Sequence, residues 1–181
     1  MVNMAKSDWT ITGDGGLSIV EIAGSKRCRL THSKLMLWNG DINLTDCEVI
    51  VDTQVYNNGN YAGGIVLRSN STATTCYRLL IVGTTTSRTY YIQKKVNGQT
   101  TTLSVASSTK PANEYVKIRF RVDGFQSSVE EWTDGDWELL SMAQDTSQAI
   151  SSGSVGLFGE SASSSYSITF DNFECNIKNG D

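Results

Sequence analysis

The sequence predicts an all-β protein folded as a two-sheet antiparallel sandwich. Hydrophobic and polar residues alternate in short runs that recur about every ten to twelve residues, whereas the helical spacing i, i+3, i+4 is hard to find. The runs end at clusters of Gly, Asn, Asp and Ser, which favour turns. Hydrophobic residues make up 39% of the chain and charged residues 19%, and the remainder is rich in Ser, Thr, Asn and Gly. Those residues suit loops and solvated strand faces better than helix interiors.

The first half of the chain contains five alternating runs. We expect strands over 17–22, 34–38, 47–56, 62–69 and 76–82. The longest run, 47–56, stops at Asn57-Asn58-Gly59-Asn60, and these residues tolerate the positive φ angles of a tight turn. The run therefore predicts a long strand that ends in a turn at 57–60.

In the second half, Asn97-Gly98 is the strongest turn signal, because a type I′ hairpin turn needs positive φ at both central positions. It joins the expected strands 89–96 and 101–105. Further strands are expected, in order, over 115–122, 125–132 and 137–142. Tight turns at Asp123-Gly124 and 133–136 would join them into a meander, and 143–152 could form a helical turn or a loop.

The closing segment contains two more alternating runs, 153–159 and 167–177, separated by a loop rich in serine at 161–165. A Phe-Asp-Asn-Phe kink interrupts the second run. We expect Phe170 and Phe173 to anchor the terminal strand in the core. With no linker and no repeat of fixed period, the chain is predicted to be one domain over 1–181, with its core at about 9–177.

The charge balance argues against several classes of partner. A net charge of −4 offers no basic surface for nucleic acid or for an anionic membrane. The first residues have no apolar run that could act as a signal-peptide core, and no segment approaches membrane-spanning length. We expect a soluble protein without a signal peptide, and no nucleic-acid or membrane partner.

The cysteine and histidine residues give little indication of a metal site or a thiol redox centre. The four cysteines are scattered and include no Cys-x-x-Cys pair, so we expect them to be reduced, small and buried. The single histidine, His32, lies in a basic, polar stretch and is expected in an exposed loop. Asp171-Asn172 could supply oxygen ligands to calcium, or Asp171 could cap the kink; we favour the kink. The sequence predicts no cofactor and no metal.

The sequence also gives little indication of a group of catalytic residues. Asp46, Glu48 and Asp52 share one face of a strand, but Asp46 belongs to the preceding turn. Glu130 and Glu131 point to opposite faces of another strand. Paired carboxylates on one strand are what retaining glycosidases need, and neither set has that order. A Gly-x-Ser-x-Gly elbow is missing as well. We expect a protein that is not an enzyme.

Seven features occur along the chain in a recognisable order: Trp9, the strand 47–56, Gly63-Gly64-Ile65-Val66-Leu67-Arg68, Tyr77-Arg78-Leu79-Leu80-Ile81, Val116 to Gly124, Val155-Gly156-Leu157 and Phe170-Asp171-Asn172-Phe173. This order resembles the concanavalin A-like lectin/glucanase superfamily, especially its laminin-G-like and 3-keto-disaccharide-hydrolase-like jelly rolls. The resemblance extends from Trp9 to Ile177. It implies two packed antiparallel sheets, one convex and one concave.

Many domains of this superfamily bind glycans on the concave face or its rim, and others are structural modules. Arg68 and Tyr77 lie on neighbouring expected strands, where they could bind a sugar from the polar face. The alternative is an internal ion pair for Arg68 and core packing for Tyr77. Trp38 and Trp132 end strands, where they could be rim aromatics or core residues, and Glu130 could hold a sugar hydroxyl beside Trp132.

The sequence favours a non-enzymatic structural or surface-display protein, such as a decoration, fibre or tail-associated component of a bacteriophage or viral virion. Its partners would be other virion or assembly proteins and cell-surface glycans, and it would be located on the virion surface. The alternative is a cellular carbohydrate-binding module or lectin. A glycoside-active enzyme is a third hypothesis, and a homo-oligomeric module whose exposed strands pair is a fourth.

Overall fold

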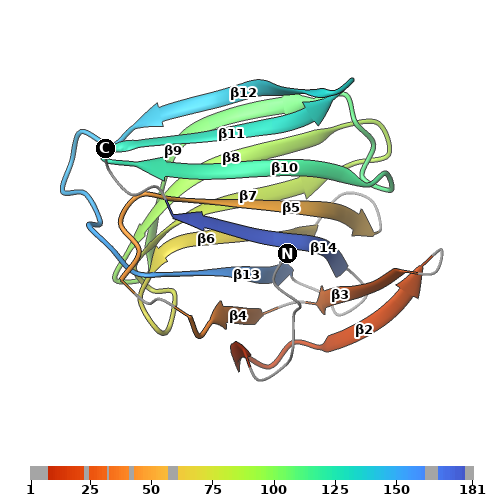
Figure 1. Cartoon of the computed structure of the whole chain (residues 1–181), viewed down its shortest axis with the longest axis horizontal. Helices are drawn as coiled ribbons and strands as arrows, with labels where there is room; N and C mark the ends of the chain where they lie inside the picture. The colour runs from red at the N-terminus through yellow and green to blue at the C-terminus, as the bar shows by residue number, and fades with distance from the viewer. Residues whose placement is uncertain are drawn as a thin grey trace.

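The computed structural model describes residues 8–22, 25–31, 33–40, 43–56, 61–161 and 167–177. Within these ranges fourteen strands form two seven-stranded antiparallel sheets packed face to face (Figure 1). The predicted two-sheet sandwich is therefore confirmed. The expected turn at 57–60, most of the serine-rich loop and His32 lie outside the described residues. The described part of the chain contains no helix long and apolar enough to cross a bilayer.

One sheet, called sheet A below, contains the N-terminal edge strand and the central meander. In order across the sheet, its strands are β1 (Trp9–Thr12), β4 (Lys34–Trp38), β13 (Ser154–Ser161), β6 (Tyr61–Ser69), β7 (Cys76–Gly83), β8 (Arg88–Val96) and β9 (Gln99–Ser108). The Asn97-Gly98 hairpin is confirmed, since the two residues have φ angles of 51° and 85° and Val96 pairs with Gln99.

The other sheet, sheet B, contains the second meander and the C-terminal strand. In order, its strands are β12 (Asp136–Gln144), β11 (Gln126–Thr133), β10 (Val116–Asp123), β5 (Cys47–Tyr56), β14 (Ser167–Ile177), β3 (Ser25–Thr31) and β2 (Leu17–Ile22). Residues 145–152, where a helical turn was one of two possibilities, form an irregular loop.

Two strands, β1 and β3, were not expected from the sequence. In β3 only Cys28 and Leu30 are buried and hydrophobic, and Ser, Lys and Arg surround them. The alternation of hydrophobic and polar residues is therefore too short in this segment to predict a strand. Antiparallel pairing with β2 and β14 makes it a strand all the same.

The core lies between the two sheets and is built from one face of each. In β10, Val116, Ile118, Phe120 and Val122 are all buried, as the alternation predicts. Cys28, Cys47 and Cys76 are buried and unpaired, as expected, and burial raises their pKa values to about 12, 12 and 11 respectively. Cys175 is also unpaired but only half-buried, so the expected burial holds for three of the four cysteines.

The closing strand contains the predicted kink. Asn172 has φ 51°, and the pairing of β14 with β5 shifts between Asp171 and Glu174. Phe170 and Phe173 are buried, and the Phe173 ring meets the Trp9 ring edge-on with centroids 5.0 Å apart. The Asp171 carboxylate accepts a hydrogen bond from the Asn172 N–H at 2.9 Å and pairs with Arg27 at 3.3 Å. Asp171 therefore caps the kink, which is the arrangement we favoured.

A fully buried arginine ties the loops at one end of the sandwich. Arg88, the first residue of β8, donates hydrogen bonds to main-chain carbonyls of Thr53 at 3.3 Å, Pro111 at 3.1 Å and Ala112 at 3.1 Å, and also to that of Glu114. Burial lowers the pKa of Arg88. The guanidinium group thus fastens the loop before β10 to the end of β5.

Replacing this group tests its contribution. Arg88→Met removes the hydrogen bonds of a buried charged donor to four main-chain carbonyls, of which those of Pro111 and Ala112 keep main-chain donors. Hydrogen bonds to charged groups contribute roughly 1.5–3 kcal/mol each. We expect the free energy of unfolding in urea to fall by at least about 3 kcal/mol. Lys117→Met, on the exposed face of β10, serves as the control and should change it by no more than about 0.5 kcal/mol. Equal effects of the two variants would contradict the proposed role of Arg88.

Candidate functional site

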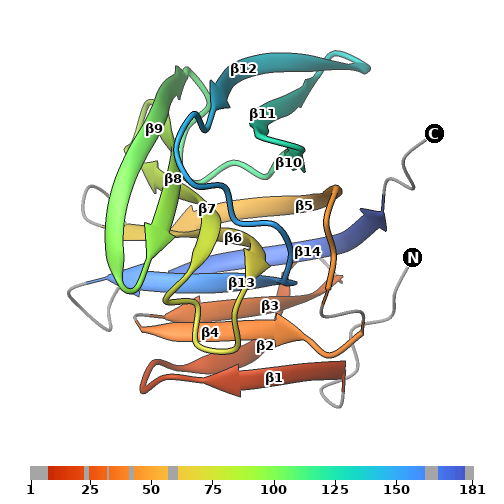
Figure 2. The ribbon, with the colours of Figure 1, turned by 90° about the vertical axis from the view of Figure 1, so that its left-hand side faces the viewer.

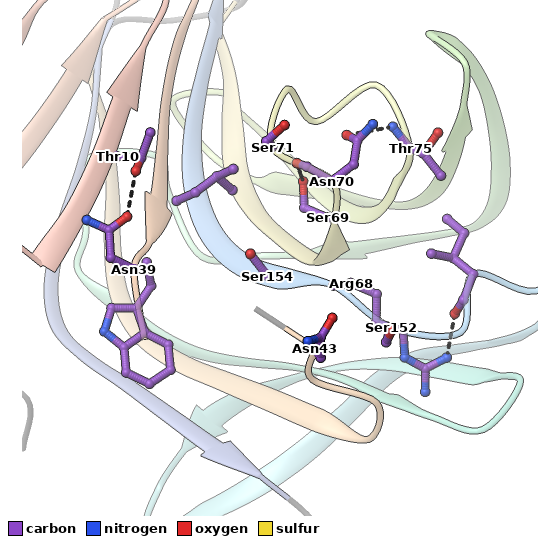
Figure 3. A pocket seen from close by; sticks show the side chains of 14 residues that line it. Thr10, Asn39, Asn43, Arg68, Ser69, Asn70, Ser71, Thr75, Ser152 and Ser154 are labelled. Atoms are coloured by element: carbon purple, nitrogen blue, oxygen red, sulfur yellow. Dashed lines mark hydrogen bonds between the residues drawn. The ribbon is translucent and has the colours of Figure 1, made fainter. Parts of the chain in front are cut away.

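A hollow of about 390 Å³ opens at the other end of the sandwich, where β4 and β6 end and β13 begins (Figure 3). Three chain segments line most of it. They supply, in order, Leu37, Trp38, Asn39 and Asn43; Arg68 to Ser71 with Thr75; and Ile150 with Ser152 to Ser154. The last two meet closely, because a Cβ on Gly153 would lie 2.4 Å from the carbonyl carbon of Arg68. Gly153 also pairs with Leu44 through two main-chain hydrogen bonds, which joins all three segments.

Hydroxyl and amide groups dominate the wall of the hollow. Figure 3 shows Asn39, Asn43, Asn70, Ser71 and Ser154 around it, with the Thr10 hydroxyl donating to Asn39 Oδ1 at 2.5 Å. In the described part of the chain, the hydroxyls of Ser71, Ser152 and Ser154 make no hydrogen bond with protein groups. Polar groups that are free to bind a ligand are what fix the orientation of a small molecule in a pocket.

Trp38 supplies the aromatic surface of the hollow. Its indole is half-buried and lies against the main chain of Gly40, where a Cβ would be 2.3 Å from the Trp38 ring. Only glycine at position 40 leaves room for the ring in this place. Of the aromatic residues predicted to bind a ligand, Trp38 is the one that the structure brings to this hollow.

Arg68 lies at the base of the hollow, but the side chain does not lie on the polar face of the sheet as expected. It is 2% exposed and has φ 49°, because β6 bulges there: Ser154 pairs with Ser69, whereas Gly156 pairs with Val66. Two residues of β6 thus face a single residue of β13, and the simple alternation ends. The predicted orientation of the Arg68 side chain was wrong because it assumed a regular strand.

The guanidinium group of Arg68 binds three loops. It donates to the main-chain carbonyls of Thr45, Gly124 at 2.8 Å and Ile150 at 2.9 Å, and it forms an ion pair with Asp46 at 2.9 Å. This is the internal ion pair that the sequence left as the alternative. Arg68 is therefore a positioning residue for the walls of the hollow.

Tyr77 lies in the core, which is the alternative that the sequence offered to a role in sugar binding. Its hydroxyl donates to Asp145 Oδ2 at 2.6 Å and accepts from the Ile150 N–H at 3.3 Å. Burial raises its pKa to about 12, so the phenol is protonated and able to donate at neutral pH. Arg68 and Tyr77 together hold both main-chain polar groups of Ile150.

Lys94 and Asp145 complete the anchoring of this loop. Lys94 Nζ lies 2.7 Å from Asp145 Oδ2 and also donates to Ser147 Oγ and to the main-chain carbonyl of Gln148. Burial alone would raise the pKa of Asp145, but hydrogen bonds from Lys94, Ser147 and Tyr77 lower it to about 2. The loop that follows β12 is thereby held at Asp145, Ser147, Gln148 and Ile150.

Sequence reasoning missed Lys94 and Asp145. Lys94 lies two and four positions after the buried residues Ile92 and Tyr90 of β8, and alternate residues of a strand point to the same face. This spacing could have identified Lys94 as an inward-facing lysine. Asp145 stands in a polar stretch without periodicity. Its partner comes from a strand about 50 residues earlier, and nothing local identifies it.

Two predicted binding residues lie elsewhere. Trp132 is 42% exposed on β11, at the outer face of sheet B, and meets the Trp137 ring edge-on with centroids 5.2 Å apart. Glu130 forms an ion pair with Arg119 on the same face. The structure does not bring Trp132 and Glu130 to the hollow that Trp38 and Arg68 line, so any sugar contact of theirs stays a separate prediction.

The carboxylates considered for catalysis are engaged in structural contacts. Glu48 pairs with Arg121 at 2.8 Å and accepts from Asn176 at 3.1 Å; burial opposes ionisation, but these contacts hold its pKa below the usual range. Asp52 accepts from Asn172 at 2.6 Å. The buried Glu131 accepts hydrogen bonds from Tyr90 and Ser108. Among the described residues, no group of three or more His, Cys, Asp or Glu could hold a metal ion.

No protein-family model and no curated protein matches the sequence. Solved structures do match. A carbohydrate-binding module, CBM66 from Bacillus subtilis, has a TM-score of 0.70 at 18% identity over 93% of this chain and 95% of its own. The exoplasmic/lumenal domain of VIP36, in a Ca²⁺/Man3GlcNAc-bound form, has a TM-score of 0.63 at 11% identity over 98% of this chain and 86% of its own. The fold is a concanavalin A-like jelly roll.

The same jelly roll occurs as one part of larger proteins. The xyloglucan PUL protein GH43B of Bacteroides ovatus matches with a TM-score of 0.61 at 16% identity over 97% of this chain. Only 36% of the Bacteroides chain is covered, so this chain spans about a third of that protein. At such identities the likeness concerns the fold of the jelly roll alone.

The contact between Lys94 and Asp145 predicts a pH dependence. Since the pKa of Asp145 is lower in the folded state, its contribution to stability is present above about pH 4, the unfolded value, and is lost as pH falls toward 2. Asp145→Asn leaves Lys94 buried without its counter-ion, and we expect the free energy of unfolding to fall by about 3 kcal/mol at pH 7. The difference in this free energy between the wild type and Asp145→Asn should narrow by about 2 kcal/mol between pH 5 and pH 2.

Urea unfolding at a series of pH values measures this gap. Asp134→Asn, in the exposed turn between β11 and β12, is the matched control and should follow the wild type throughout. A gap for Asp145→Asn that stays constant from pH 7 to pH 2 would show that Asp145 does not titrate as described.

Proposed function

We propose that the chain is a carbohydrate-binding module or lectin and that the hollow beside Trp38 is its binding site. The observation that carries the proposal is the composition of this wall: one half-buried indole among hydroxyl and amide groups. An aromatic ring packs against the apolar C–H face of a sugar, and hydroxyls and amides bind the sugar hydroxyls around it.

The charge of the hollow supports an uncharged ligand. Arg68 is the only charged residue in the described lining, and Asp46 pairs with it at 2.9 Å. Its remaining donors face main-chain carbonyls. A neutral polyhydroxylated molecule suits such a wall, whereas a phosphate or carboxylate ligand would meet no unpaired cation.

Preorganisation supports binding as well. Because Arg68 and Tyr77 hold the Ile150 main chain, and Gly153 pairs with Leu44, the walls lose little conformational freedom when a ligand enters. Ordering a loop on binding reduces affinity, so a wall that is fixed beforehand favours it.

The comparisons support the same proposal, since CBM66 is a carbohydrate-binding module and the VIP36 domain was solved with Man3GlcNAc bound. They support the alternative that the sequence suggested, a cellular module or lectin, better than the virion component that we expected first. Nothing in them supports virion partners or homo-oligomers. A location on the virion surface stays a prediction.

Trp38 provides the test. A glycan array should identify sugars that bind, and calorimetric titration should then show at least a tenfold weaker affinity for Trp38→Ala, equal to about 1.4 kcal/mol, with Trp38→Phe in between. Val105→Ala, at a 52% exposed position of β9 outside the hollow, should bind as the wild type does. Thermal unfolding shows whether each variant is folded.

Two results would contradict the proposal. One is the absence of binding to any arrayed glycan, and to sugars at millimolar concentration in the calorimeter. The other is binding that a folded Trp38→Ala variant retains at full strength, which would place the sugar elsewhere on the molecule.

A further inference from the structure

A second hollow, of about 810 Å³, lies next to the first. The β8–β9 hairpin and the loop after β12 line it, and it shares two lining residues, Thr75 and Ile150, with the hollow beside Trp38. Figure 2 shows the segment that connects β12 to β13 running past β8 and β7 on its way to β13, which is the path that places Ile150 between the two hollows.

The shared boundary is fixed in place. The Ile150 N–H donates to the Tyr77 hydroxyl, and its carbonyl accepts from Arg68. On the other side, Thr75 Oγ1 accepts from the Asn97 N–H at 3.2 Å, which attaches the loop after β6 to the β8–β9 turn. The boundary that the two hollows share is therefore part of the folded structure.

The second hollow has the same chemical character as the first. Its wall presents the amides of Asn97, Gln99 and Gln148 and the hydroxyls of Thr101 and Ser151. Lys94 is the one cation in the described lining, and Asp145 neutralises it at 2.7 Å. Both hollows thus offer neutral hydrogen-bonding groups, and each has a volume in the range of sites for small ligands, roughly 300–1,000 Å³.

From these observations we infer that the two hollows form one continuous groove that binds an uncharged oligosaccharide, with one sugar unit against Trp38 and the following units crossing Ile150 into the second hollow. The inference rests on the proposed function and adds the ligand class: an oligosaccharide chain, with a free monosaccharide occupying the first hollow alone. Units beyond the first add contacts with Gln99 and Thr101, so affinity rises with chain length.

Filling the second hollow tests this. Gluco-, xylo- and manno-oligosaccharides of increasing length, each with its monosaccharide, are titrated into the wild type, Thr101→Trp and Val105→Trp. Both substitutions add an indole to β9, but Val105 does not line the hollow. The longest oligosaccharide of a binding series should bind the wild type and Val105→Trp at least tenfold more tightly than the monosaccharide.

In Thr101→Trp, the same oligosaccharide should bind no more than about threefold more tightly than the monosaccharide, whose own affinity is unchanged. Gln99→Ala, a smaller change, should reduce the length dependence while leaving the monosaccharide affinity intact, and it keeps the test valid if Thr101→Trp does not fold. Affinity that is independent of length in the wild type would overturn the inference and leave the proposed function standing.

Two other results have equally definite meanings. Equal length dependence in all folded variants would place the additional sugar units outside the second hollow and would overturn the inference alone. Failure of every sugar to bind the wild type would overturn both the proposed function and the groove.

Discussion

Two buried arginines, one at each end of the sandwich, hold the loops of this protein in place. Arg68 and Arg88 lie in sheet A, yet most of their hydrogen bonds go to main-chain carbonyls of loops that follow or precede strands of both sheets, and Arg88 also bonds to the Thr53 carbonyl within β5. A guanidinium group has five N–H donors in a fixed plane, so one side chain can satisfy carbonyls that regular β pairing leaves unpaired. The jelly roll supplies the two sheets, and these two side chains determine how its ends are closed.

The candidate site depends on this closure. The hollow beside Trp38 depends on Arg68. This residue lies in one lining segment and fastens to it the loop at Thr45 and Asp46 and, 82 residues further along the chain, the Ile150 main chain. The second layer of support, formed by Tyr77, Asp145 and Lys94, fixes the loop between the two hollows from the other side. Polar networks of this kind are stable when each member has a partner, and here the two charges pair with each other. The loop between the two hollows is consequently held by protein contacts alone.

The sequence predicted the fold well because alternation and turn residues are local signals. The face of β10 formed by Val116 to Val122, the Asn97-Gly98 turn and the Phe170 to Phe173 kink all depend on neighbouring residues. The site was predicted only in part. Trp38 was identified by its position at a strand end, but the inward turn of Arg68 results from a bulge in its pairing with β13, and the partner of Lys94 is on a distant loop. Such facts depend on the packing of remote segments, which a single sequence does not reveal.

The way Arg68 holds its loops has a consequence for how this protein can diversify. Apart from Asp46, every group that accepts a hydrogen bond from Arg68 is a main-chain carbonyl, which any amino acid provides. Side chains on the anchored loops are therefore under no constraint from the anchor itself, as long as the backbone keeps its course. Descendants of this chain could exchange Ser71, Ser152 and Ser154 in the wall of the hollow, and so change the sugar that they recognise, without loosening the scaffold beneath.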